Sequence, residues 1–146
     1  MTRSRLITVL VGVALAVSLP LAGHWLRQGG PPRCAYDGQH IEPRYRVRVV
    51  DHAGRAHDCC CARCATRWLE QSPDAADVVV TDEPSGEEID SRGAYFVESA
   101  VVTNRVTGNH VHAFRDRAAA EEHARAYGGL LLKGSERPLQ LGEASK

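Results

Sequence analysis

The feature that most constrains this chain is a group of four cysteines within six residues. Cys59, Cys60, Cys61 and Cys64 lie together, and a fifth cysteine, Cys34, precedes them. An odd number of cysteines leaves at least one thiol unpaired, and adjacent cysteines rarely bridge each other without strain. A disulfide from Cys34 to the group is one interpretation in an oxidising compartment. A soft-metal site is the other.

The spacing of the cysteines favours a metal site at the start of a helix. If Asp58 caps a helix that runs from about Cys59 to Gln71, then Cys60 and Cys64 lie on one face, with Cys61 beside them. A helix N-terminus lowers the pKa of thiols, which prepares them for a metal. Thiolates select copper(I), zinc or iron–sulfur centres over hard cations.

Two histidines are predicted accessory ligands. His57 ends a predicted strand just before the cysteines, and His112 alternates with His110 on one face of a later strand. Exposure to solvent is the commoner state for such a pair, and a role as ligands from the second half is the alternative. The candidate metal ligands are therefore Cys34, Cys60, Cys61, Cys64, His57 and His112.

The N-terminal segment has the pattern of an export signal. Arg3 and Arg5 precede an uncharged apolar run from Leu6 to Ala22, which is the order of a Sec signal or signal anchor. We therefore expect residues 1–27 to be a signal peptide or a single-pass anchor in the inner membrane, followed by a linker over residues 28–33. The soluble part would then lie in the periplasm or outside the cell.

Charge and composition exclude other functions. Eighteen basic residues balance eighteen acidic ones, and aromatic residues make up only 5% of the chain. No net field attracts nucleic acid, and few rings are available to stack on bases. The sequence has no glycine-rich phosphate loop and no Gly-x-Ser-x-Gly motif. Nucleic-acid binding, nucleotide chemistry and serine-hydrolase chemistry are therefore not expected.

The hydrophobic pattern predicts two halves with the same order of elements. In each half two short strands precede a helix and a third strand. The predicted elements of the first half are residues 45–50, 55–58, 59–71 and 77–81, and those of the second half are residues 94–102, 110–114, 116–127 and 130–132. We therefore predict an α+β fold of two small tandem ββαβ-type units, residues 34–83 and 92–133, with an irregular tail over residues 134–146.

Several short motifs occur in a recognisable order. Cys34-Ala-Tyr-Asp-Gly-Gln-His-Ile41 stands where one family has Cys-x-x-Cys-Gly-Met-x-Ile, and the order continues through His112-Ala-Phe114 to Gly128-Gly129-Leu-Leu. Over residues 34–133 the chain resembles the NosL family, copper(I)-carrying accessory proteins of nitrous-oxide reductase. The resemblance implies two ββαβ units, a fold shared with organomercurial lyases.

The chain departs from that family at its metal ligands. Asp37 replaces the second cysteine of the family motif, and Gln39 replaces its methionine. Because the only methionine is Met1, thioether coordination in the family's manner is not available. The extra thiols after residue 58, together with His110 and His112, are the groups that could compensate.

Two further resemblances concern the same cysteines. Cys34 followed by Cys60-x-x-x-Cys64 resembles a TRASH-type metal-trafficking knuckle. Cys34-x-x-Asp37 resembles the catalytic motif of organomercurial lyase, with Cys60 as the second thiol. That chemistry needs two thiolates to hold mercury and a carboxylate to relay a proton.

The sequence therefore predicts a non-enzymatic, membrane-tethered metal-binding protein outside the cytoplasm. It would carry copper(I), with zinc as the alternative metal, to a recipient metalloenzyme or metal transporter. Two other functions stay open: a structural zinc or disulfide-stabilised assembly module, and an enzyme like the organomercurial lyases.

Overall fold

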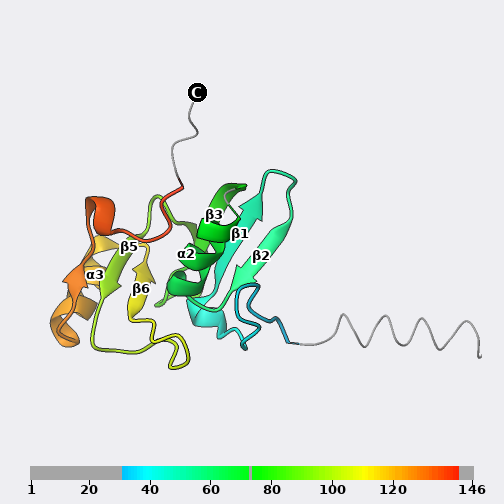
Figure 1. Cartoon of the computed structure of the whole chain (residues 1–146). Coiled ribbons are helices and arrows are strands. Elements are labelled where there is room, and N and C mark those ends of the chain that lie inside the picture. The colour runs from blue at the N-terminus through cyan, green and yellow to red at the C-terminus, as the bar shows by residue number, and fades with distance from the viewer. Residues whose placement is uncertain (1–30, 73, 142–146) are drawn as a thin grey trace, which may run out of the picture. The chain divides into compact units, whose positions relative to one another are not determined.

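Two small antiparallel sheets, each packed against one helix, form the described part of the molecule (Figure 1). The computed structural model describes residues 31–72 and 74–141. The chain divides into two units, Met1–Pro31 and Pro32–Lys146, and every element below belongs to the second. The predicted signal or anchor helix lies outside the described residues, and among those that are described no helix is long and apolar enough to cross a bilayer.

The first sheet has the strand order β2-β1-β3-β4. Its central strand β1 alternates buried valines, Val47 and Val49, with half-buried residues, as expected for a strand with one face on the core. Helix α2 packs on β1 and β2. The bounds are β1 Val47–Asp51, β2 Ala56–Cys59, α2 Ala62–Gln71, β3 Ala75–Thr81 and β4 Glu88–Asp90, with the short 3-10 helix η1 at Pro43–Tyr45 before them.

The second sheet has the order β6-β5-β7 and is covered by α3. A glycine is required where the chain leaves α3, because a Cβ on Gly129 would lie 2.7 Å from the carbonyl oxygen of Glu98. The chain can therefore pass close to β5 and add β7 at its edge. The bounds are β5 Tyr95–Glu98, β6 Val111–Phe114, α3 Arg117–Ala126, β7 Leu130–Leu131 and the 3-10 helix η2 Gly134–Glu136.

The α+β prediction is confirmed, and the order strand–strand–helix–strand occurs in both halves. Helix α2, however, begins at Ala62 and not at Cys59. The reason is that β2 stays paired with β1 as far as Cys59, opposite Val47, so the backbone is still extended there. The short strand β4 was not predicted, because its three residues contain one apolar side chain, Ile89, and carry no periodic signal.

The two halves share one main core. Cys34, Val78 and Phe96 belong to the same cluster of buried residues, although they come from opposite halves of the chain. Leu139 is also buried in this cluster. Two residues before Leu139, Arg137 ties this segment to the chain ahead of β5 by donating hydrogen bonds to the backbone carbonyls of Ser91, Arg92 and Ala94. Between η2 and residue 141 the chain has no regular secondary structure, but Leu139 packs in the core.

Candidate metal centre

A tight turn presents the first two side chains of the site. Gly38 adopts a positive φ of 70°, and its amide donates to the carbonyl of Cys34 at 2.8 Å. The Asp37 carboxylate accepts the Gln39 amide at 3.0 Å, which is the geometry of an Asx-turn. The amide of Ala35 donates to the carbonyl of Asp58 at 2.8 Å. This bond holds the turn against the end of β2, beside the other cysteines.

The junction between β2 and α2 presents the remaining thiols. Cys60 follows the last paired residue of β2, Cys61 is the N-cap of α2 with extended backbone (φ −170°), and Cys64 lies in the first helical turn. All five cysteines are buried free thiols. A strand-to-helix junction and a turn therefore converge on one small volume.

Three sulfurs and one carboxylate form a compact group. The ligand atoms of Cys34, Asp37, Cys60 and Cys64 all lie within 4.8 Å of one another. The Sγ atoms of Cys60 and Cys64 are 3.5 Å apart, and Cys64 Sγ lies 3.2 Å from an Asp37 oxygen. We call these four residues the thiol site. Three of them, Cys34, Cys60 and Cys64, were predicted ligands.

The sulfurs and the carboxylate shift one another's pKa values. Hydrogen bonds with Cys60 and Cys64 lower the pKa of Cys61. The pKa of Cys60 is raised, chiefly by its hydrogen bond to Cys61, and that of Cys64 is raised, chiefly by its hydrogen bond to Cys60. Burial acts to raise the pKa of Asp37, but hydrogen bonds from the Gln39 amide and two thiols bring it below the ordinary value. A metal ion that binds here must therefore displace protons from Cys60 and Cys64.

A loop of the second half covers the thiol site. Residues 99–110, the covering loop, connect β5 to β6. Asn104 Nδ2 donates to Cys60 Sγ at 3.1 Å, and Thr107 Oγ1 lies 3.5 Å from Cys61 Sγ. Asn109 accepts the Arg63 amide at 3.2 Å, which satisfies one free donor at the start of α2. The second half thus completes a site whose ligands all belong to the first.

Cys61 and Cys59 lie beside the thiol site. Cys61 Sγ is 4.0 Å from Cys60 Sγ but is turned toward Thr107, because its extended backbone differs from the helical geometry on which its prediction rested. Cys59 ends β2 and is fully buried, and burial raises its pKa. Neither belongs to the compact group of four.

The structure does not bring His57 to the thiol site. His57 lies in β2, two residues before Cys59, and its Nε2 is 3.3 Å from a carboxylate oxygen of Asp51. Its ring packs on that of Trp68, with 4.5 Å between centroids. The pleat of β2 and the pairing with β1 place this side chain among partners of the first sheet, so proximity in sequence was misleading.

His112 is also placed away from the thiols. Its side chain is 1% exposed, and its Nδ1 lies 2.8 Å from Glu83 Oε1. Its Nε2 faces Ser99 Oγ at 3.2 Å and the Val101 carbonyl at 3.1 Å. Both ring nitrogens therefore have partners within the protein. His112 therefore anchors the start of the covering loop through Ser99 and Val101. It is neither exposed to solvent nor part of the thiol site.

Sequence reasoning missed two contributors to the site. Asp37 was singled out only as a replaced cysteine and as a lyase-like carboxylate, although its place in Cys34-x-x-Asp37 was the available signal. Asn104 gave no signal, because it lies 44 residues from Cys60 and reaches it only through the pairing of β5 with β6.

The donor set fits a soft metal ion. Buried thiolates bind copper(I) and zinc, and one carboxylate beside three sulfurs does not form a site for magnesium or calcium. Asp37 can either coordinate the metal or accept hydrogen bonds from the thiols as they exchange protons.

The fold, two small α+β units in one domain, is shared with a solved structure. The copper chaperone NosL from Shewanella denitrificans superposes with a TM-score of 0.61 and 20% sequence identity, over 72% of this chain and 88% of that one. The predicted resemblance is thereby confirmed at the level of fold. No family model matches the chain, and no curated protein matches it.

Proposed function

We propose that this protein is a copper(I) carrier that holds its metal at the thiol site and passes it on by ligand exchange. The observation that carries the proposal is the convergence of Cys34, Cys60, Cys64 and Asp37 within 4.8 Å. The shared fold with a copper chaperone supports the same function. Three sulfurs suit copper(I) in low coordination, which allows a fourth ligand to enter and remove the metal.

The protein would act outside the cytoplasm, tethered through residues 1–27. This part of the proposal rests on the basic residues and the apolar run at the N-terminus. The recipient would be a metalloenzyme under assembly or a metal transporter. Neutral overall charge gives the protein no general attraction to membranes or nucleic acids, so recognition of the recipient would come from the surface around the thiol site.

The experiment is a competitive titration of the anaerobic protein with copper(I) in the presence of a chromophoric chelator. We expect one copper per chain, and we expect Cys60→Ser/Cys64→Ser to lose it. A second titration uses zinc. Retention of zinc without competitive copper(I) binding, or loss of folding on chelation, would favour the structural module instead.

One arrangement at the thiol site also bears on the lyase alternative. Cys34 and Cys60 lie with Asp37 in one group, which is the set of two thiols and a carboxylate that cleavage of a carbon–mercury bond requires. We expect the protein to bind an alkylmercury compound without releasing the hydrocarbon. Gas-phase detection of that hydrocarbon would overturn the carrier proposal in favour of an enzyme.

A further inference from the structure

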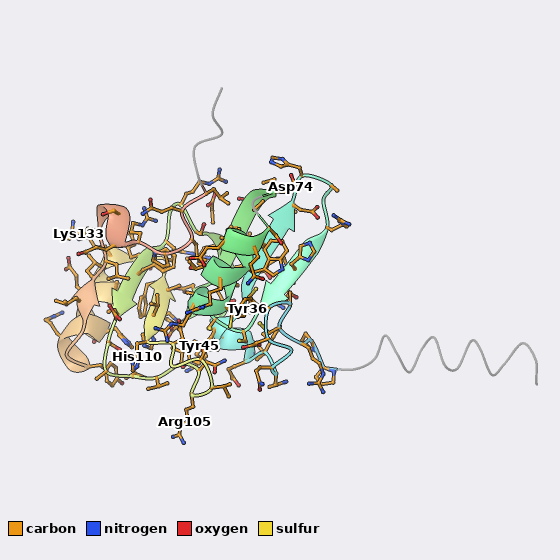
Figure 2. All side chains as sticks on the ribbon, in the orientation of Figure 1. Tyr36, Tyr45, Asp74, Arg105, His110 and Lys133 are labelled. Atoms are coloured by element: carbon orange, nitrogen blue, oxygen red, sulfur yellow. The ribbon has the colours of Figure 1, made fainter. Side chains whose placement is uncertain are left out.

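An opening on the surface is lined in part by Cys64, a buried residue of the thiol site. It has a volume of about 240 Å³ and is lined by Tyr36, Arg63, Cys64, Arg67 and Thr107. Cys64 is the member of the thiol site that lines it. We call this opening the mouth. Figure 2 shows Tyr36 beside the first turns of α2, where the mouth lies.

The mouth is positively charged. Arg63 and Arg67 are four residues apart on α2, so they project from the same face, and both are exposed. Arg63 donates to the carbonyls of Thr107 at 2.6 Å and Gly108 at 3.1 Å, neutral acceptors that leave its charge uncompensated. The start of α2 adds the positive end of the helix dipole.

Several other arginines of the domain, in contrast, pair with carboxylates. Arg46 and Arg48 pair with Glu88, Arg92 pairs with Asp90, and Arg115 pairs with Glu87. Within residues 31–72 and 74–141, no salt bridge involves Arg63 or Arg67.

Three acidic residues lie close to the mouth without lining it, and one of them is Asp37, which contacts Cys64. Glu70 and Glu98 line a neighbouring groove, which shares Arg63 and Arg67 with the mouth. The residues that line the mouth itself include no carboxylate. An anion that enters the mouth therefore meets two guanidinium groups along its lining, although the Asp37 carboxylate lies 3.2 Å from Cys64 Sγ.

We propose that copper(I) enters and leaves through this mouth as the complex of a small thiol that carries carboxylate groups. The inference rests on the proposed copper function. The guanidinium groups of Arg63 and Arg67 would hold the carboxylates while the metal changes ligands. A volume of about 240 Å³ is below the roughly 300–1,000 Å³ of pockets for drug-sized ligands, which suits a ligand no larger than a short peptide.

The exchange step conserves the oxidation state. The bond from copper(I) to the donor's sulfur breaks, and a bond from copper(I) to Cys64 Sγ forms. The proton of the Cys64 thiol passes to the departing thiolate, which leaves as a neutral thiol with its carboxylates still ionised. Delivery runs the same step in reverse: an incoming thiol at the mouth gives its proton to Cys64 Sγ as its own sulfur takes the copper(I).

The test is the rate of copper(I) transfer to the full-length apoprotein from two donors at low ionic strength. Copper(I)–glutathione is the donor with carboxylates, and copper(I)–dithiothreitol is the donor without them. We expect Arg67→Gln to slow transfer from glutathione about threefold to tenfold, as loss of electrostatic steering does, and to leave transfer from dithiothreitol unchanged. Arg67→Glu should slow transfer from copper(I)–glutathione further, and Arg67→Lys should restore it. Added salt should shrink the wild-type advantage.

Arg105→Gln is the matched control. Arg105 is an exposed arginine on the covering loop (Figure 2), and it does not line the mouth. Arg105→Gln changes the net charge by the same amount as Arg67→Gln, but outside the mouth. It should therefore leave the rate of transfer from copper(I)–glutathione unchanged. Equal slowing by Arg105→Gln, or equal effects of Arg67→Gln on both donors, would overturn the proposal while copper binding stands. Failure of the wild-type protein to bind copper(I) at equilibrium would instead overturn the proposed function.

Discussion

The two halves of the domain have the same order of elements but divide the work at the thiol site. In each half, a two-residue step separates the second strand from the helix, β2 to α2 and β6 to α3. In the first half this step and the next turn carry thiols, whereas in the second half they carry none. The equivalent pairs are Cys59 and Phe114, Cys61 and Asp116, and Cys64 and Ala119.

The difference shows that the fold supplies a location and the sequence decides its chemistry. The strand-to-helix step of the first half faces the covering loop, which Asn104 and Thr107 bring to the sulfurs. The second half instead buries His112 between Glu83 and Ser99 at the base of that loop. One half therefore carries the thiol site, and the other holds the covering loop in place.

The largest effect is expected on copper(I) affinity, when a ligand cysteine of the first half is compared with a neighbouring cysteine that is not a ligand. Cys34→Ser should lower copper(I) affinity by more than about 100-fold, because loss of a ligand exceeds the 10–100-fold cost of losing an outer partner. Cys59→Ser should lower it by about tenfold at most, since Cys59 lies outside the thiol site and is only a neighbour of Cys34. Competition against a chromophoric chelator measures both. A comparable loss in both variants would contradict the assignment of ligands.

The second half should respond through stability. His112→Ala removes one member of a buried, hydrogen-bonded pair with Glu83, which we expect to cost on the order of 3 kcal/mol in the free energy of unfolding. The folded variant should keep its copper(I) affinity. Urea unfolding and the chelator titration test the two statements separately. A large loss of affinity at unchanged stability would restore His112 as a ligand.

A substitution at Asp37 tests how much its carboxylate contributes to copper(I) binding. Asp37→Asn keeps the shape of the turn but removes the charge, and we expect copper(I) affinity to fall about tenfold as for an outer partner. The competition titration against a chromophoric chelator measures the effect. Unchanged affinity would show that Asp37 has no part in binding.

The smallest effect concerns the end of β1 farthest from the thiols. Hydrogen bonds from the Arg55 backbone and side chain, and then from His57, lower the pKa of Asp51 from 3.8 to about 2 against the effect of burial. A lowered carboxyl pKa stabilises the fold above the ordinary value near 3.8, and that contribution is lost as the pH falls through about 2. Asp51→Asn should therefore be less stable than the wild type at pH 6, and the difference should shrink toward pH 2. A constant difference in thermal midpoint would contradict this.

The local sequence pattern predicted most strands and helices, because their positions depend mainly on neighbouring residues. The alternation around Val47 and Val49, the cap at Asp116 and the glycines after α3 gave strands and helices close to their observed places. The shared position of Cys34, Cys60 and Cys64 followed from spacing and a family resemblance.

The remainder depends on contacts between residues far apart in sequence. His57 is drawn to Asp51 and Trp68 by the pairing of β1 with β2. His112 meets Glu83 because β6 packs beside β3. Cys61 turns to Thr107 because the extended register of β2 delays the start of α2. A spacing rule applied to one segment cannot predict these contacts.

Copper(I) binding by the thiol site is tested most directly by X-ray absorption at the copper edge of the anaerobic, one-to-one copper(I) protein. We predict a first shell dominated by sulfur, without the outer-shell scattering of imidazole, and its loss in Cys60→Ser/Cys64→Ser. A first shell of nitrogen with imidazole scattering, or a spectrum unchanged by the double substitution, would contradict it.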